Sequence, residues 1–228
     1  MRTFFRRSLW DMVPRDQRDT PEGLRRRQVV AAAVVLVGAI VLGWSLRLEP
    51  GGNLFYVAAV VLAGVWAAGA FLSGQLHLGR ITRHESLGRP VVAPIVLGLG
   101  LALVFVLGAL VVRQIPPLES YVSSVLQYAD EGSVPVIAVI TFFNGIAEEL
   151  FFRGAMYAAI PHHPVVWTTL AYVVATLATG NVMLAFAAIL LGAVCGLQRR
   201  ASGGVLAPIL THVTWSLSML FLLPLLFA

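Results

Sequence analysis

The stretch Asn144-Gly-Ile-Ala-Glu148-Glu149-Leu-Phe-Phe-Arg153 places two adjacent carboxylates and an arginine inside the apolar run 134–160. Even on the lowest scales, each such charge costs about 2.5–3.5 kcal/mol at the centre of a bilayer. Charged groups kept there mark a function by default, although the same three groups can also form an ion cluster that holds helices together. The stretch therefore predicts a polar site within a membrane-spanning helix.

Helical spacing assigns different surroundings to the two carboxylates. Glu149 and Arg153 are four residues apart, so they share a face and are expected to form an ion pair. Glu148 is rotated by about 100° from this pair and shares its face with Asn144 and Phe152. A carboxylate without a cation on its own helix is a candidate general base.

The composition is that of a polytopic membrane protein and excludes a soluble domain. Of the 228 residues, 58% are hydrophobic and 12% are charged, and the mean hydropathy is +0.85. The net charge of +5 is distributed by membrane side, so we expect the lipid bilayer as a partner and no nucleic acid. A single cysteine, Cys195, provides neither a disulfide framework nor a cysteine-based metal site.

Apolar segments predict an all-α, polytopic membrane helical bundle with about seven transmembrane helices, although six or eight spans also fit the pattern. The expected spans are residues 29–46, 54–74, 91–112, 134–160, 165–179, 182–197 and 205–227. The fifth and sixth are short for a hydrocarbon core of about 30 Å. We divide the chain into an Arg-rich segment (1–28), N-terminal transmembrane helices (29–133) and a candidate catalytic core (134–228).

The distribution of arginine predicts the orientation. Residues 1–28 contain eight arginines against four acidic residues, and Arg25-Arg26-Arg27 directly precedes the first span. The loops expected outside hold only Arg47 and Arg113. By the positive-inside rule, we expect a multi-pass protein of the cell membrane with a cytoplasmic N-terminus and, with seven spans, an outer C-terminus.

Among the five histidines, only His212 lies within a predicted span. It shares a helical face with Ser216. A histidine on an apolar helix is usually a packing residue, but pairing it with the spare carboxylate of Glu148 would bury both groups at the lowest cost. At 1.5 Å per residue, His212 and Glu148 lie roughly 12 and 18 Å from the inner ends of their spans, so one cavity could hold both.

These residues resemble a known family. Glu148-Glu149-Leu-Phe-Phe-Arg153 matches E-E-x-x-x-R, and residues 190–212 are similar to the stretch that leads to the last motif of the CAAX-protease and bacteriocin-processing family (CPBP or Abi) of intramembrane endopeptidases. The resemblance covers about residues 134–220. It implies that Glu148 activates the attacking water, that Glu149 and Arg153 hold the helix and the geometry, and that His212 positions water or stabilises the oxyanion.

The chain departs from the other two motifs of that family. Ser216 stands where the last motif, H-x-x-x-N or H-x-x-x-D, has its amide or acid. A hydroxyl can still donate one hydrogen bond, so we count Ser216 as a candidate catalytic residue with Glu148, Glu149, Arg153 and His212. The middle motif, F-x-x-x-H, aligns with Ala175 and Thr179, and a threonine cannot replace an imidazole as a base or ligand. Asn181 could supply an amide nearby, so we count Asn144, Thr179 and Asn181 as candidate residues lining the site.

The same departure weakens the case for a metal. A catalytic zinc needs about three protein ligands. The spans offer one histidine and two carboxylates, one of them tied to Arg153. We therefore expect no metal ligands; zinc follows from the family label alone, with an incomplete ligand set. A metal-free mechanism needs one base, one oxyanion donor and a water-filled pocket.

The sequence thus favours an intramembrane endopeptidase acting on a membrane-associated peptide or protein. One alternative is a catalytically impaired relative that acts as a membrane scaffold or immunity protein, which the missing middle histidine favours. The other is a small transporter that uses Glu148 and His212 as relay groups, although the broken half-helices of transporters are not evident.

Overall fold

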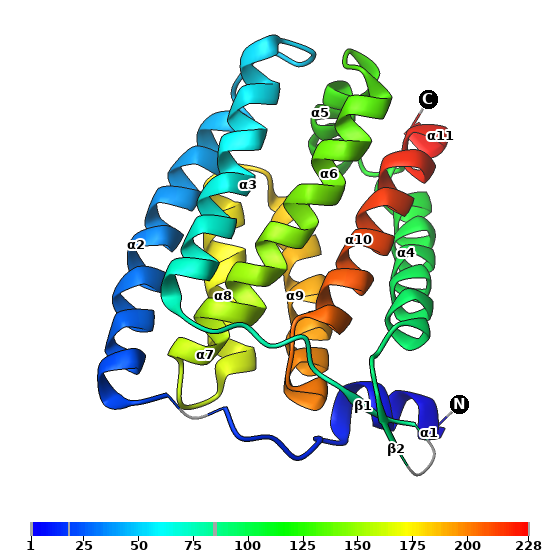
Figure 1. Cartoon of the computed structure of the whole chain (residues 1–228). Coiled ribbons are helices and arrows are strands. Elements are labelled where there is room, and N and C mark those ends of the chain that lie inside the picture. Colours follow the sequence, from blue (N-terminus) through cyan, green and yellow to red (C-terminus); the bar gives the residue numbers. More distant parts are fainter. Residues whose placement is uncertain (1, 18, 84–85, 228) are drawn as a thin grey trace.

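The computed structural model describes residues 2–17, 19–83 and 86–227. Six of its helical segments are long and apolar enough to cross a membrane. These are α2 (Pro21–Ser45), α3 (Asn53–Ser73), α4 (Val92–Val112), α6 (Val134–Glu149) with its continuation into η2 (Leu150–Met156) and α7 (Tyr157–Ala159), α9 (Val182–Ser202), and α10 (Leu206–Leu222) with α11 (Pro224–Phe227). The predicted all-α polytopic bundle is confirmed (Figure 1).

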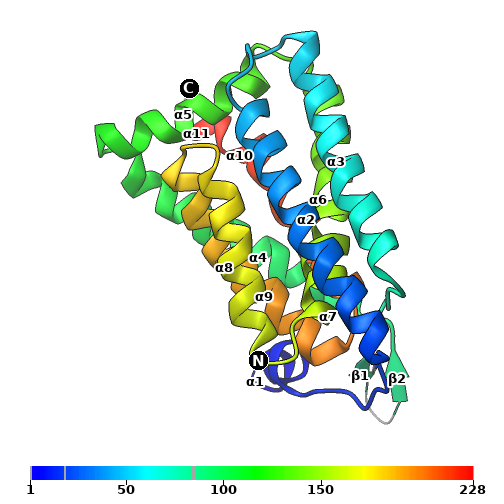
Figure 2. The ribbon, with the colours of Figure 1, turned by 90° about the vertical axis from the view of Figure 1, so that its left-hand side faces the viewer.

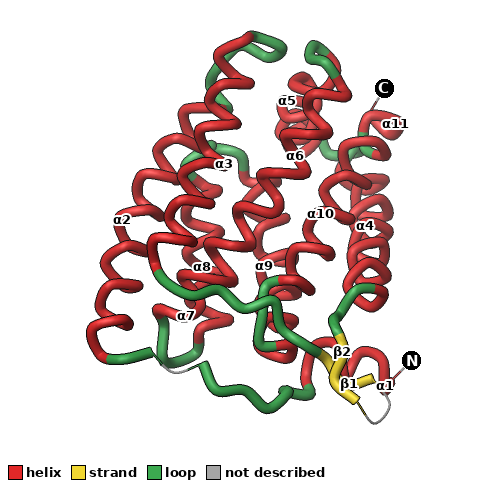
Figure 3. The backbone as a smooth tube through the Cα atoms, viewed as in Figure 1, coloured by secondary structure: helices red, strands yellow, loops and turns green. Residues whose placement is uncertain are grey.

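The remaining elements are short. They are α1 (Arg2–Phe5), η1 (Arg6–Trp10), β1 (Ile81–Arg83), β2 (Ser86–Gly88), α5 (Pro116–Asp130) and α8 (Pro164–Leu177). β1 and β2 form an antiparallel hairpin within a loop for which we predicted no strands; it is the yellow element in Figure 3. α8 is the fifth predicted span, and its 14 residues reach only about 21 Å. The elements α1 and α11 lie at opposite ends of the bundle, as an odd number of crossings requires (Figures 1 and 2).

α2 begins eight residues before the predicted start of the first span. The side chain of Thr20 caps the helix by accepting a hydrogen bond from the backbone N–H of Gly23 at 3.1 Å. Pro21 fits the first helical position and Glu22 suits the positive end of the helix dipole. The three arginines that precede the apolar residues therefore lie within the helix rather than before it.

Six helices close into a ring. Going round it, α2 packs on α3, α3 on α6, α6 on α10, α10 on α9, α9 on α8, and α8 back on α2. α4 lies outside this ring against α10, as Figure 1 shows. The acidic motif belongs to α6 and η2, so the ring determines which side chains can reach it.

An aromatic cluster fills the ring beside the motif. The Trp66 ring stacks on Phe151 with centroids 4.9 Å apart and contacts Phe152 at 5.1 Å. Phe152 in turn contacts the ring of Tyr172 at 4.9 Å. α2 comes close to this cluster because Gly38 has no side chain; a Cβ there would overlap the Trp66 ring. Packing from α2, α3 and α8 therefore fixes the position of the motif.

Candidate active site

The motif lies where α6 widens into the π-helical turn η2. Glu148 and Glu149 are the last residues of α6, and Arg153 lies within η2. All five residues of the segment 151–155 are buried, since η2 passes through the interior of the ring. π-Helical turns occur frequently at functional sites, where they redirect side chains that a regular helix would space differently.

Glu149 connects two helices through one oxygen. Its carboxylate is fully buried, and its Oε1 accepts hydrogen bonds from Arg153 Nη1 at 2.9 Å and from His212 Nδ1 at 2.8 Å. The predicted ion pair of Glu149 and Arg153 is confirmed. The predicted pairing of His212 with Glu148 is wrong, because the neighbouring carboxylate faces α10 and can accept from both donors.

Glu148 has a different partner. It is partly buried, and its Oε2 accepts a hydrogen bond from the hydroxyl of Tyr172 in α8 at 2.7 Å. The guanidinium of Arg153 lies over the ring of Tyr172, 5.0 Å from its centroid. Tyr172 was not among the site residues predicted from the sequence. The available signal was a phenol in a short apolar helix, since a buried tyrosine hydroxyl usually requires a partner.

The contact with Glu149 determines the tautomer of His212. This histidine is 5% exposed, and its Nδ1 faces an ionised carboxylate that can only accept. With Nδ1 as the donor to this carboxylate, Nε2 is the ring nitrogen left to interact with another group. A buried carboxylate that orients an imidazole in this way is a recurring arrangement in hydrolytic sites.

Two further predicted residues lie within one turn of the cluster. The amide of Asn144 donates to the carbonyl oxygens of Ala59 and Ile140, and its buried Oδ1 has no partner among the described residues. The hydroxyl of Ser216 donates to the carbonyl of Val213 in its own helix at 3.3 Å. The amide nitrogen of Asn144 and the hydroxyl of Ser216 are thus occupied by backbone carbonyls, whereas the Oδ1 of Asn144 is not.

The structure does not bring Thr179 and Asn181 to the cluster. Asn181 caps α9 and donates to the carbonyl of Tyr121 in α5, and both residues line a separate cavity of about 300 Å³. α8 reaches Glu148 through Tyr172, seven residues before Thr179, and this separation is about 10 Å along a helix. The residue of α8 that contacts the acidic motif is therefore Tyr172 and not Thr179.

The site does not present a set of metal ligands. Within the described ranges, no group of three His, Cys, Asp or Glu side chains is placed so that it could hold an ion. A zinc site would require about three protein ligands, whereas Glu149 Oε1 and His212 Nδ1 are bonded to each other. The metal-free mechanism stays a prediction.

Residues 130–218 match a family model described as "Type II CAAX prenyl endopeptidase Rce1-like". The resemblance to the CPBP family is confirmed over this segment. The Rce1-like segment contains the whole polar cluster, whereas α1 to α4 lie outside it. Searches of curated proteins and of solved structures returned no match.

Proposed function

We propose that the chain is an intramembrane endopeptidase that cleaves a membrane-associated peptide or protein, with Glu148 as the general base. One observation carries this proposal. Glu148 is the carboxylate of the cluster that is only partly buried, and in the described part of the chain it has no ion-pair partner. Glu149 beside it is fully buried and already neutralised by Arg153.

In the proposed mechanism, Glu148 removes a proton from a water molecule, and the resulting hydroxide attacks the carbonyl carbon of the scissile peptide bond. The tetrahedral intermediate collapses as Glu148 returns the proton to the leaving amine. Tyr172 positions the carboxylate through its 2.7 Å hydrogen bond. Aligning a base in this way supplies part of the rate enhancement by orientation.

His212 is proposed to contact either the attacking water or the oxygen of the reacting carbonyl. In its neutral form Nε2 accepts a hydrogen bond from the attacking water. In its protonated form Nε2 donates to the developing oxyanion, and the adjacent Glu149 stabilises the imidazolium at 2.8 Å. Arg153 keeps Glu149 in place, so both act as positioning residues and do not contact the substrate.

We infer that the end of the bundle with α1 and the β-hairpin faces the cytoplasm. At this end Arg15, Arg27 and Arg199 line one cavity, and Arg15 donates to the carbonyl of Arg200, which agrees with the positive-inside rule. A substrate would then reach Glu148 from the cytoplasmic half of the cell membrane.

The test is cleavage in reconstituted membranes. Wild type and Glu148→Gln are placed in lipid nanodiscs with lipid-anchored and transmembrane peptides, and products are measured by mass spectrometry. Losing the base should lower turnover by about 10²-fold or more. Glu131→Gln, the same change at an exposed carboxylate after α5, is the matched control and should cleave like wild type.

Equal cleavage by Glu148→Gln and wild type would refute Glu148 as the base. Folded protein should be retained in Glu148→Gln, because a neutral amide is less costly to bury than a carboxylate. If wild type cleaves neither class of peptide while remaining folded, the scaffold alternative replaces the enzyme.

A further inference from the structure

A second polar site lies at the α1 end of the bundle, separate from the acidic cluster. It is a cavity of about 230 Å³ between the N-terminal segment, the start of α2, the loop after α3, the turn from α7 to α8, and α9. We call it the basal cavity. Its cationic and titratable lining consists of Arg15, Arg27, His77, Tyr157 and Arg199. Glu148, Glu149 and His212 do not line it.

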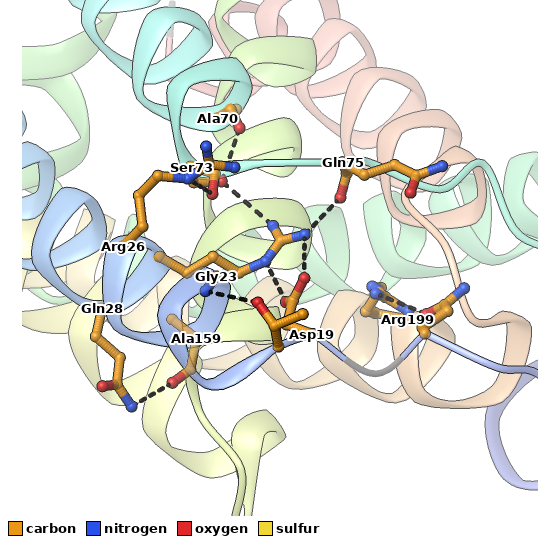
Figure 4. A network of polar contacts seen from close by, with 12 residues as sticks. Asp19, Gly23, Arg26, Gln28, Ala70, Ser73, Gln75, Ala159 and Arg199 are labelled. Atoms are coloured by element: carbon orange, nitrogen blue, oxygen red, sulfur yellow. Dashed lines mark hydrogen bonds and ion pairs between the residues drawn. The ribbon is translucent and has the colours of Figure 1, made fainter.

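Positive charge in the basal cavity exceeds the negative charge nearby. Arg27 is 3% exposed and forms an ion pair with Asp19, and its Nη2 also donates to the carbonyl of Gln75 at 2.9 Å. Figure 4 labels both partners, Asp19 and Gln75. Neither Arg15 nor Arg199 has an ion-pair partner among the described residues. No carboxylate of the described chain lines the cavity. Two cations therefore remain uncompensated.

Arg199 is the more unusual of the two. It is 5% exposed, yet its partners are neutral: Nε donates to the carbonyl of Arg153 at 2.7 Å, and Nη2 to Gln17 Oε1 at 3.3 Å. Its guanidinium also lies 4.9 Å from the centroid of the Tyr157 ring. Buried cations are normally paired with an anion, because neutral partners compensate only part of the lost hydration. The geometry holds this guanidinium at the cavity wall.

The size and the remaining walls of the cavity limit which ligands it can bind. Sites for drug-sized molecules have about 300–1,000 Å³, so this volume suits a small anionic group. Leu76 and Ile160 add apolar surface beside the arginines. Trp10, in the short η1 that packs against α9, is 56% exposed. Exposed tryptophan next to arginine is typical of the membrane–water interface.

We propose that the basal cavity binds a phosphate group, as presented by the head group of an anionic phospholipid. Arg15 and Arg199 contact the phosphate oxygens, and the apolar wall receives the glycerol end of the lipid. Basic pockets between transmembrane helices at the cytoplasmic face are suited to such head groups. Guanidinium groups bind phosphate through two parallel N–H donors, which gives geometric as well as electrostatic recognition.

The experiment measures lipid retention and thermal stability of the full chain. Protein in neutral detergent is mixed with phosphatidylglycerol or with zwitterionic phosphatidylcholine, and bound lipids are counted by native mass spectrometry. A second arm adds inorganic phosphate and follows the unfolding midpoint against sodium chloride of equal ionic strength. Binding to the folded state raises this midpoint.

Arg15→Gln is the decisive variant, because Arg15 is exposed and its side chain makes one hydrogen bond within the described ranges, to the carbonyl of Arg200. It should retain phosphatidylglycerol about five-fold less well, the effect expected for one basic residue near an anionic surface. Arg199→Gln should weaken retention further. Arg25→Gln removes the same charge from an exposed position of α2 that does not line the cavity, and it should behave like wild type.

Retention of phosphatidylglycerol over phosphatidylcholine that is weakened by Arg15→Gln and not by Arg25→Gln supports the site. If inorganic phosphate also raises the unfolding midpoint, the phosphate group alone is recognised. If the lipid binds but inorganic phosphate does not raise the midpoint, the glycerol and the acyl chains contribute to binding. Equal weakening by Arg15→Gln and Arg25→Gln would overturn the proposal in favour of general surface attraction. The proposal would also be overturned if wild type retained phosphatidylglycerol no better than phosphatidylcholine and inorganic phosphate stabilised it no more than sodium chloride.

Discussion

At the scale of single residues, two adjacent carboxylates have opposite surroundings. Glu149 is enclosed and bonded to Arg153 and His212, whereas Glu148 is partly buried and accepts one phenolic hydrogen bond. Glu149 therefore has a structural role, and Glu148 remains available for proton transfer. The two can be tested separately because their partners lie on different helices.

The first prediction concerns Tyr172. Replacing it by phenylalanine removes the hydroxyl that holds Glu148 and keeps the ring that packs on Phe152. If the proposed base needs this alignment, kcat should fall by about ten-fold with little change in KM, the pattern of an interaction that matters in the transition state. Steady-state cleavage kinetics measure this. A change confined to KM would contradict a positioning role.

The second prediction concerns the buried ion pair. Glu149→Gln leaves the guanidinium of Arg153 enclosed without a counter-ion, at a cost of about 3–5 kcal/mol. We expect a clearly lower unfolding midpoint in detergent. Adding Arg153→Met to this variant removes the unpaired charge and should restore part of the loss. Failure of the double variant to recover would indicate that hydrogen bonding to His212 matters more than the charge.

The third prediction concerns pH. Burial lowers the pKa of His77, and the nearby Arg199 and Arg27 lower it further, while Asp19 opposes them. As the pH falls, His77 of the unfolded chain takes up a proton near its ordinary pKa of about 6.5, before His77 of the folded chain does. The free energy of unfolding therefore decreases below about pH 6.5 and is regained above it.

The corresponding measurement compares unfolding midpoints at pH 7.5 and 5.5. His77→Asn should lose less stability over this interval than wild type, since it removes the proton uptake of the unfolded state. The background from other titrating groups is common to both proteins. An identical decrease in the two would exclude a contribution from His77.

At the scale of helices, glycine determines how closely two helices approach. Gly38→Ala would drive a methyl group into the Trp66 ring, an overpacking that typically costs about 1–3 kcal/mol. Gly64→Ala is the matched control in α3, because a Cβ there meets no atom within 4 Å. We expect a lower unfolding midpoint for the first variant and an unchanged or slightly higher one for the second. Equal midpoints would show that α2 can shift to accommodate the methyl group.

The sequence predicted what depends on local periodicity. The apolar segments appear as helices, and the spacing of Glu149 and Arg153 gives the observed pair. It did not predict Tyr172 opposite Glu148, or His212 on Glu149, because these contacts depend on how α8 and α10 are rotated within the ring. Thr20 and Pro21 indicate the early start of α2, but the predicted start of the first span followed hydropathy alone.

At the scale of the whole molecule, the placement of α1 and α11 at opposite ends argues that α8 also traverses the bundle. A reporter fused after the last residue should therefore be extracytoplasmic, given a cytoplasmic N-terminus. Alkaline phosphatase, active only outside, provides the measurement. The same reporter inserted between Gly203 and Gly204 should be inactive. Cytoplasmic behaviour at the C-terminus would reduce the count to six crossings.

The π-helical turn at 150–156 makes the spacing of the site sensitive to chain length. The turn is anchored at its middle residue, since Arg199 donates to the carbonyl of Arg153. Deleting one residue from η2 would convert the wide turn toward a regular helix and rotate all preceding residues by about 100°. Glu149 would then leave α10 and Glu148 would leave α8. An insertion or deletion in this segment would therefore dismantle the site even if the side chains of Glu148, Glu149 and Arg153 were all kept.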